Sequence, residues 1–491
     1  MKNNTLYIGG SIRPHLVLSL IPIIDGFCKK KNINKIIFEK NISNKIKSNV
    51  LFKKLHEKYT IYYLDKLSLN KNFFLRSLIR FLFFLFFYFA SFFFKEKYLL
   101  NQSISWLTKQ IFHSYWDTGI INNTYKLDKI EFKSRIKSCI QFSNKFLDFW
   151  ILKIAKIKYA FFGHMVYSER FLFALIRNEG VEMYRYNGSI LIKQEKKFDR
   201  DSKYIDKKIY KKSFKFISNN QIKEYWSNLQ KGHSKNEEVN FAIKIKSQKK
   251  KYNSKAINVI MLHIFKDSSF DDIDVNRIFH DYYSWVFETL KIIKNSKEVW
   301  ILRKHPSADR WGENQKQIVN DIFKKVFGDR KPSNILFEEN SRSNFEQFKI
   351  SKRIITYSGS SHLEAACLGL KPIVISDVDL IKYNKNYVFK PKNYNEYKNL
   401  LLKHDRKYFY LGKNKNLIPK RVMFLLQNVV NFSDYTGCRH LFRKDSKKLF
   451  NSTFNDTKKK IKINYNYLFK IGYNIGAIYN QGINKKYYLK F

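Results

Sequence analysis

The chain has few cysteines for its length. Its 491 residues include four of them, Cys28, Cys139, Cys367 and Cys438. Their positions show neither the pairing of a disulfide framework nor the spacing of a metal-binding motif, which is typical of a reducing compartment. The first stretch of the chain, M-K-N-N-T-L-Y-I-G-G, also lacks the apolar core and small-residue cleavage site of a signal peptide. We therefore expect a cytoplasmic protein.

Long apolar runs are scarce as well. The most apolar stretch is residues 73–94, and its part without charge, residues 81–94, is shorter than the roughly 20 residues of a transmembrane helix. Arg76 and Arg80 precede that part, and Lys95 and Lys97 follow it. Two interpretations remain open, a core helix of the N-terminal domain and a helix in the membrane interface. Basic and aromatic side chains both suit an anionic surface, which favours peripheral contact with the inner face of a membrane.

Acidic residues are the third scarcity: 41 Asp and Glu stand against 93 Lys and Arg, a formal net charge of +52. Because the lysines are spread through the whole chain, the charge points to no specific partner. Neither an aromatic platform nor a recognition helix supports specific nucleic-acid binding. No acidic cluster suggests a metal site, so we expect metal-independent chemistry and no bound cofactor.

What is present is enough apolar material for large cores. Hydrophobic residues make up 44% of the chain, including 45 Phe and 32 Tyr, which excludes a disordered protein. A chain of this length is too long for one ordinary core, so two domains are expected.

The first half begins with a strand, a glycine turn and a helix. Residues 5–8 predict the strand, Gly9 and Gly10 the turn, residues 14–29 the helix and residues 36–39 the next strand. This order is typical of a doubly wound sheet.

The same pattern recurs in residues 159–164, Y-A-F-F-G-H, a helix over 168–178 and a strand over 181–186. His15 and His164 each follow a strand at the carboxyl edge of the predicted sheet. Each is a candidate general base, and each could equally be an ordinary residue of a helix start.

In the second half, two strands end in histidine. Residues 257–263, I-N-V-I-M-L-H, predict a buried strand that ends at His263. In residues 297–307, Arg303 and His305 alternate onto one face of a strand that Pro306 ends. Both side chains are thus expected at the carboxyl edge of the second sheet.

A serine-rich turn follows a third strand of this half. Residues 354–357 predict the strand, Ser358, Gly359, Ser360 and Ser361 the turn, and residues 361–368 a helix. Free N–H groups and hydroxyls at such a turn suit a phosphate, although an ordinary capped helix would have the same sequence.

Glu364 has two interpretations of its own. Its spacing from Ser361 is that of a capping box; alternatively, its carboxylate contacts a ribose. The conjunction of R-x-H-P with S-G-S-S-x-x-E about 50 residues later predicts one phosphate site that includes Arg303 and His305.

These residues carry a family resemblance. The second half resembles the nucleotide-binding domain of GT-B glycosyltransferases, in particular bacterial capsule and surface-polysaccharide biosynthesis proteins. In those enzymes an H-P motif and a Ser-rich turn hold the phosphate of the sugar donor, and a glutamate on the following helix meets the ribose. His305-Pro306, Ser360-Ser361 and Glu364 are the matching positions. Residues 263–270, H-I-F-K-D-S-S-F, are similar to an H-x-x-x-D segment of polysaccharide-cluster proteins, which adds His263 to the predicted donor site.

The resemblance covers roughly residues 255–380 and implies an α/β protein of two Rossmann-like domains with an interdomain cleft. Residues 1–250 would be the acceptor-side domain, 255–430 the domain that binds the nucleotide sugar, and 431–491 a basic extension. In GT-B proteins a terminal helix, here residues 422–430, often crosses back to the first domain. The chain lacks the D/E-D/E-G element that sialyltransferases use for their base, which argues against a CMP–sialic acid donor.

The implied function is transfer of a sugar from a nucleotide-activated donor to a surface polysaccharide of capsule or lipopolysaccharide type. The acceptor would be a glycan or a lipid-linked glycan at the inner membrane. Two hypotheses of other classes remain: a nucleotide-sugar 2-epimerase of the same fold, and a non-catalytic basic protein associated with nucleic acid or membrane.

Overall fold

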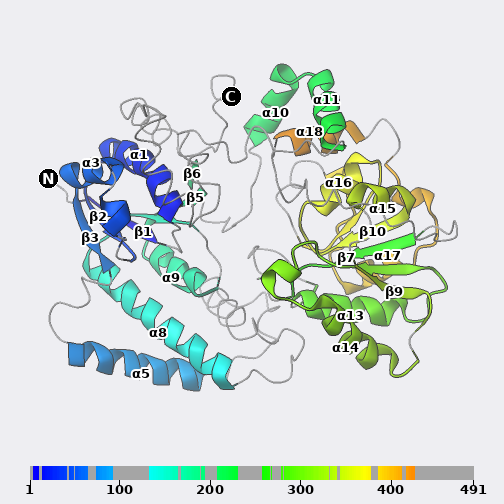
Figure 1. Cartoon of the computed structure of the whole chain (residues 1–491), viewed down its shortest axis with the longest axis horizontal. Coiled ribbons are helices and arrows are strands. Elements are labelled where there is room, and N and C mark those ends of the chain that lie inside the picture. Colours follow the sequence, from blue (N-terminus) through cyan, green and yellow to red (C-terminus); the bar gives the residue numbers. More distant parts are fainter. Residues whose placement is uncertain are drawn as a thin grey trace.

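The chain folds into two α/β lobes, each built on one sheet, in a computed structural model (Figure 1). The described residues are 4–9, 14–40, 42, 44–48, 50–64, 73–91, 132–163, 167–187, 190–193, 207–230, 257–265, 267, 278–279, 281–330, 332–339, 343–376, 385–411 and 416–425. The predicted extension 431–491 lies outside them. The predicted fold class, α/β with two sheets of parallel strands, is confirmed.

The first sheet has six strands in the order β3-β2-β1-β4-β5-β6. They are β1 (Asn4–Gly9), β2 (Ile33–Phe38), β3 (Thr60–Tyr63), β4 (Tyr159–Phe162), β5 (Glu182–Asn187) and β6 (Ile190–Lys193). All neighbours are parallel except β5 and β6. Strands added to both sides of β1 define a doubly wound sheet.

Helices cover both faces of this sheet. Side chains alternate along each strand, so Leu6 and Ile8 pack on one face and Tyr7 on the other. The helices of the first lobe are α1 (Pro14–Lys31), α2 (Asn44–Lys47), α3 (Val50–Lys58), α5 (Phe73–Ser91), α8 (Phe132–Ile154) and α9 (Tyr167–Asn178). The predicted apolar segment 73–94 is therefore mainly helix α5, which packs along α8 (Figure 1). Within the described part of the chain, no helix has both the length and the apolar character needed to cross a membrane.

The second sheet has five parallel strands in the order β11-β10-β7-β8-β9. They are β7 (Ile257–Met261), β8 (Trp300–Arg303), β9 (Ile335–Glu338), β10 (Ser351–Thr356) and β11 (Ile373–Val374). Ile260 and Leu302 face one hydrophobic core, and Val259 and Ile301 face the other. Burial on both sides explains why these strands read as continuous apolar runs.

Eight helices of the described residues belong to the second lobe. They are α10 (Lys207–Phe216), α11 (Asn219–Gln230), α13 (Tyr282–Ile293), α14 (Gln315–Phe327), α15 (Asn344–Ile350), α16 (Ser361–Cys367), α17 (Tyr394–Leu402) and α18 (Leu417–Phe424). Trp226 of α11 and Phe424 of α18 share a core with Leu363 of α16. Helices α10 and α11 thus precede the second sheet in sequence and pack with its lobe in space (Figure 1).

One prediction about this lobe needs correction, and another is tested only in part. The helix predicted over 422–430 overlaps α18, which starts earlier and packs on α16 and α11. Residues 426–430 lie outside the described residues, so the crossing to the first domain stays a prediction. The strand predicted over 297–307 ends at Arg303, so His305 lies in the loop after it. Continued alternation along the strand therefore does not place these two side chains on one face.

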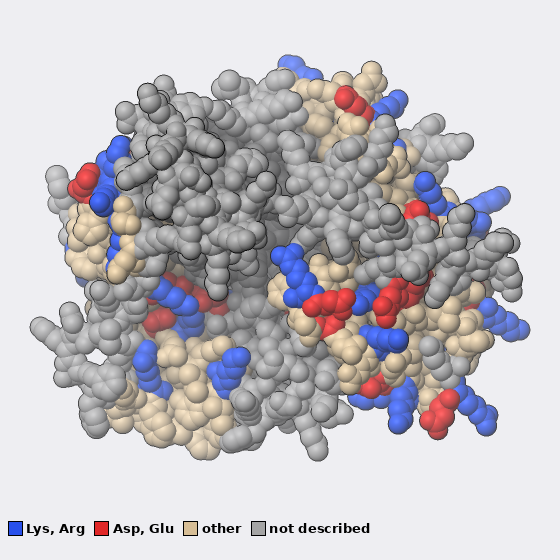
Figure 2. Space-filling model, viewed as in Figure 1, with Lys and Arg blue, Asp and Glu red and all other residues tan. Residues whose placement is uncertain are grey.

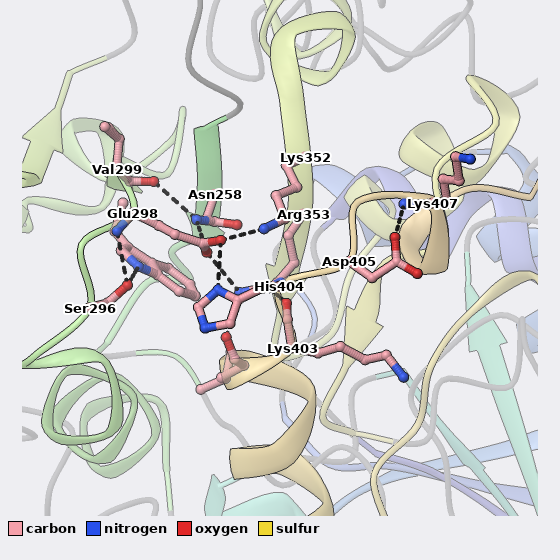
Figure 3. A network of polar contacts seen from close by, with 12 residues as sticks. Asn258, Ser296, Glu298, Val299, Lys352, Arg353, Lys403, His404, Asp405 and Lys407 are labelled. Atoms are coloured by element: carbon pink, nitrogen blue, oxygen red, sulfur yellow. Dashed lines mark hydrogen bonds and ion pairs between the residues drawn. The ribbon is translucent and has the colours of Figure 1, made fainter.

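The amino end of the second sheet is held by a charged network around Glu298 (Figure 3). The Glu298 carboxylate accepts a hydrogen bond from Asn258 Nδ2 at 2.9 Å and forms an ion pair with Lys352. Arg353 Nη1 lies 3.6 Å from it, and Nδ1 of the exposed His404 lies 3.3 Å away. These contacts tie together the starts of β7, β8 and β10.

Arg353 is the most buried charged member of this network, with a fully buried side chain. Its guanidinium donates to the carbonyl oxygens of Leu401 and Lys403. It also lies 5.3 Å from the ring centroid of Trp300 and 4.5 Å from that of Phe409. The cation is thus bonded and packed on several sides, which offsets its desolvation.

Candidate functional site

The candidate site lies where the strand connections of the second sheet change direction. From β7 the chain continues to β8 and β9 on one side, then returns to add β10 and β11 on the other. The loops after β7 and β10 therefore diverge, and open α/β folds bind ligands at the crevice this produces. His263 lies in the loop after β7, and the turn of residues 358–361 follows β10.

His263 joins these two loops. Its Nε2 lies 2.8 Å from the Ser358 carbonyl oxygen. The backbone N–H of Ser358 lies 3.2 Å from the same nitrogen, so Nε2 donates to the carbonyl in one tautomer and accepts from the N–H in the other. The Thr356 hydroxyl, 3.2 Å from the same nitrogen, donates to the same carbonyl at 2.7 Å. The ring of Tyr282 stacks on the imidazole at a centroid distance of 4.6 Å.

Gly359 is required where it stands. Its φ of +94° lies in the left-handed region, and a Cβ there would come 3.3 Å from Cε1 of His263. Ser358, Gly359 and Ser361 are partly exposed, and Ser360 is exposed. The turn therefore presents its backbone and hydroxyls at the surface while its base rests on His263.

His305 lies beside this pair. Its ring centroid is 6.4 Å from that of His263. The backbone N–H of Ser307 donates to Nδ1 of His305 at 3.1 Å, so the neutral ring carries its proton on Nε2. Since the side chain is partly exposed, Nε2 can act as a donor towards a ligand. The structure thus brings His305, His263 and the Ser358–Ser361 turn together.

Gln315, which the sequence analysis did not single out, fixes the spacing of the two histidine loops. The side chain is completely buried. Its Oε1 accepts from the backbone N–H of His305 at 2.8 Å, and its Nε2 donates to the carbonyl oxygen of His263 at 2.7 Å. Glu313 Oε1 accepts from Gln315 Nε2 and from the N–H of Phe265. One amide therefore holds the loops after β7 and β8 in register.

Both histidines of the site are neutral at physiological pH. Burial lowers the pKa of His263 to about 3, with a smaller effect from the neighbouring His305. Burial also lowers the pKa of His305 to about 4. The free site therefore presents hydrogen-bond donors without positive charge on these rings.

The capping box predicted for Ser361 and Glu364 is wrong. The residue at the N-cap of α16 is Ser360, and its side chain makes no capping hydrogen bond. Instead Ser360 Oγ donates to Glu364 Oε1 at 3.1 Å, and Asn344 Nδ2 donates to Oε2 at 2.9 Å. The carboxyl is 6% exposed, and burial raises its pKa despite these two donors. Of the two interpretations, only the ribose contact remains, as a prediction.

Arg303 occupies a different layer of the site. It ends β8 and is only 2% exposed, in register with Met261 and Glu338 on the flanking strands. Its charge opposes the rise in the pKa of Glu364, so it acts on that carboxyl through the protein interior. The predicted contact between Arg303 and a phosphate stays a prediction.

The two histidines predicted as general bases belong to the first lobe. His15 lies in the first turn of α1, but its side chain is outside the described set, and His164 lies outside the described residues altogether. Their roles stay predictions.

The described carboxyl edge of this sheet instead shows a buried charge cluster that the sequence analysis missed. Lys145 of α8 pairs with Glu39, which follows β2, and lies 2.5 Å from Glu169 in the first turn of α9. Burial raises the pKa of Glu169 to about 7, with Lys145 opposing and Glu39 adding to the effect. These three residues are about 130 positions apart at the extremes, so no local spacing could have indicated the cluster.

Among the described residues, no group of three or more His, Cys, Asp and Glu side chains could hold a metal ion. The expectation of metal-independent chemistry stays a prediction, as does the interdomain cleft.

No family model matches the chain, and no curated protein does. Similar solved structures include a UDP-GlcNAc 2-epimerase from Methanocaldococcus jannaschii in complex with UDP-GlcNAc and UDP, at 14% identity and a TM-score of 0.28; the match covers 86% of this chain and 99% of that one. A glycosyltransferase from Rickettsia africae ESF-5 matches at 12% identity and a TM-score of 0.29, over 98% of this chain and 99% of its own. The calicheamicin glycosyltransferase CalG4 matches at 7% identity and a TM-score of 0.26, over 86% and 94%. Such low TM-scores carry no inference about this chain, whose fold follows from its own strand order.

Proposed function

We propose that this protein is a glycosyltransferase that moves a sugar from a nucleotide-activated donor to a surface-polysaccharide acceptor. One observation carries the proposal: the motif residues of the second half converge at the switch point of the second sheet. His263 contacts the carbonyl oxygen of Ser358, and the ring centroid of His305 lies 6.4 Å from that of His263. Residues separated by about 95 positions thus form one surface at the place where such folds bind nucleotides.

The second lobe would hold the donor phosphates. Nε2–H of His305 and the backbone N–H of Gly359 are donors of the kind that a diphosphate accepts. The Ser361 hydroxyl would join them by turning from its 3.4 Å contact with Thr356, whereas the Ser360 hydroxyl already donates to Glu364. Donors fixed before the reaction stabilise the charge that develops on a departing nucleotide. Glu364, which retains lone pairs beside the Ser360 and Asn344 contacts, would accept from a ribose hydroxyl.

The first lobe would supply the acceptor side and the base. His15 and His164 remain candidates for the base, and Glu169, with a pKa near 7, is a third. The acceptor would be a glycan or lipid-linked glycan of capsule or lipopolysaccharide type, at the cytoplasmic face of the inner membrane. Neither metal nor cofactor has a part in this proposal.

A donor screen tests the phosphate site. We expect one of UDP, CMP, GDP and CDP to raise the melting temperature of the protein, and we expect His305→Ala to remove that shift. His56→Ala is the matched control, because His56 is an exposed histidine on α3 of the other lobe. Equal shifts in wild type and His305→Ala would contradict the proposed site.

Acceptor dependence tests the reaction itself. With the sugar form of the stabilising nucleotide, a transferase releases nucleotide only when a glycan acceptor is added. Conversion of the donor without acceptor would instead identify a nucleotide-sugar epimerase and refute glycosyl transfer.

A further inference from the structure

Helix α5 is apolar on the side that faces away from the protein. Five large side chains on this helix are exposed: Leu78 (43%), Phe81 (53%), Leu82 (54%), Phe86 (64%) and Phe89 (60%). At 3.6 residues per turn they fall within an arc of about 140°. We call these five residues the outer face of α5.

The opposite side of α5 is already used for packing. Phe87 is buried and makes edge contacts with Phe146 of α8 and Phe171 of α9. Phe83 packs against Phe146 at a centroid distance of 4.6 Å. The lobe therefore needs only the inner side of the helix, and an ordinary surface helix would be polar on the other. A contiguous exposed apolar surface of this kind marks a binding site.

The charges around the outer face favour an anionic occupant. Residues 73–95 contain no Asp or Glu, and basic residues stand on both sides of the exposed stripe in the sequence. Figure 2 shows the surface over α5 and α8, at the lower left, as residues that are neither acidic nor basic, with basic side chains beside them.

An exposed aromatic side chain of α8 belongs to the same helix pair. Trp150 is 42% exposed and contacts Phe146, against which Phe83 on the inner side of α5 packs. The ammonium of Lys153 lies 5.3 Å from the Trp150 ring and is paired with Glu179 at 2.9 Å. An exposed tryptophan on such a helix pair is typical of the membrane interface.

We infer that the outer face of α5 is a docking surface for an anionic lipid bilayer, with the helix lying along the membrane plane. The apolar side chains would enter the acyl boundary, and the basic residues would remain among the headgroups. This partner goes beyond the proposed chemistry and does not depend on it.

Vesicle flotation in the absence of any nucleotide tests the inference. We expect the full-length protein to float with vesicles of equal parts phosphatidylcholine and phosphatidylglycerol, and to float far less with phosphatidylcholine alone. Phe86→Ser with Phe89→Ser should lower the partition coefficient by about tenfold or more. Leu78→Ser with Leu82→Ser is a second variant of the same face, for use if the first does not fold.

The matched control replaces two exposed apolar residues of the second lobe, Ile350→Ser with Leu402→Ser, which should leave flotation unchanged. Unchanged flotation of both outer-face variants would overturn the inference, and so would an equal loss in the control. A wild-type dimer that floats no better than background and becomes monomeric in the outer-face variants would show that a second copy covers this face instead. Because nucleotide shifts are measured separately, failure here leaves the proposed function standing, and the reverse also holds.

Discussion

The two ends of the second sheet differ in the charge of their buried side chains. At the amino end, Glu298, Lys352 and Arg353 keep their charges, and each is bonded to a partner. At the carboxyl end, His263 and His305 are neutral at physiological pH, because burial lowers the pKa of both imidazoles. The charged groups at the amino end thus have their ion-pair partners within the chain. The carboxyl end leaves donors at the surface, on a turn that is partly exposed.

The difference lies in what each set of groups can still bind. A buried charge that is already paired within the protein gains nothing from a ligand. If its side chain is removed, the partner charge stays buried without a counter-charge, which lowers the stability of the fold. A neutral imidazole at a loop edge costs less to bury and can still donate to an anion. Substitutions at the amino end should therefore lower the stability of the protein, and substitutions at the carboxyl end should weaken its binding of a ligand.

The largest effect is expected at the amino end. Arg353→Met should lower the free energy of unfolding by about 3–5 kcal/mol, because the carbonyl oxygens of Leu401 and Lys403 lose their donor and Glu298 loses a neighbouring cation. Urea denaturation measures this. His404→Ala, which removes the exposed member of the same network, should change it by no more than about 0.5 kcal/mol. Similar values for the two variants would refute the view that burial makes Arg353 the important member.

Acid should act on the two ends in different pH ranges. The pKa of the buried His362, beside the turn, is lowered from 6.5 to about 4. Between these values the unfolded chain binds a proton that the folded chain does not, so stability should fall as pH falls from 6.5 to 4, by about 1.4 kcal/mol per unit for this residue. The pKa of Glu298 is lowered from its ordinary value of 4.5, so its contribution to stability is present above that pH and is lost only as the pH falls below it.

Urea midpoints at a series of pH values test this separation. His263 and His305 also have lowered pKa values, so His362→Gln should lessen the decline between pH 6.5 and 4 by its own share and leave theirs in place. His56→Gln on the surface is the control. An unchanged slope in His362→Gln would show that folding does not lower the pKa of this residue.

The next effect concerns the turn itself. Gly359→Ala should cost about 1–2 kcal/mol and should also weaken nucleotide binding, since the new methyl group meets His263. Gly312→Ala is the matched control: its φ is +65°, but a Cβ there has no atom within 4 Å. Both variants should lose similar stability by differential scanning calorimetry. Only Gly359→Ala should lose affinity by titration calorimetry, and equal affinities would contradict the role of the turn.

Binding should draw a proton to the carboxyl end. A phosphate beside His305 favours the charged ring and so raises its pKa from about 4 towards neutrality. Affinity for the nucleotide sugar should therefore increase several-fold as pH falls from 8 to about 5.5. Calorimetry in buffers of different ionisation enthalpy should detect proton uptake, and His305→Gln should abolish it. Proton uptake that persists in His305→Gln would assign it elsewhere.

A substitution of Glu364 separates ribose from phosphate recognition. Glu364→Gln keeps the shape of the side chain and should weaken the binding of the nucleotide by about tenfold, because an amide oxygen is a poorer acceptor than a carboxylate. Inorganic pyrophosphate, which has no ribose, should bind the variant and the wild type equally in a competition assay. Equal weakening of both ligands would place Glu364 at the phosphates instead.

Most strands of both sheets could be predicted because burial on two faces leaves a plain signal. The strands predicted over 5–8, 257–263 and 354–357 correspond to β1, β7 and β10. Strand β6 and helix α10 were not predicted, because they lie at the margins of a polar, lysine-rich region. The four residues of β6 are too few to establish a period.

The candidate site was predictable as a set of motifs, not as a geometry. That His263 meets Ser358 depends on β7 and β10 being neighbours, which is a property of strand order. The capping box failed by one residue, since the N-cap is Ser360 and not Ser361. With the N-cap shifted by one residue, the Glu364 carboxylate accepts from side chains and not from the backbone. The spacing of residues in the sequence cannot locate a helix start to within one residue.

Gln315 gives the carboxyl end a property that charged residues could not. A carboxamide neither gains nor loses a proton across the physiological range, so the link between the loops of His263 and His305 is the same in acid and in base. The distance between the rings is thereby set independently of their ionisation. Acidity can alter how strongly this surface attracts an anion while leaving unchanged the size of the anion that it accommodates.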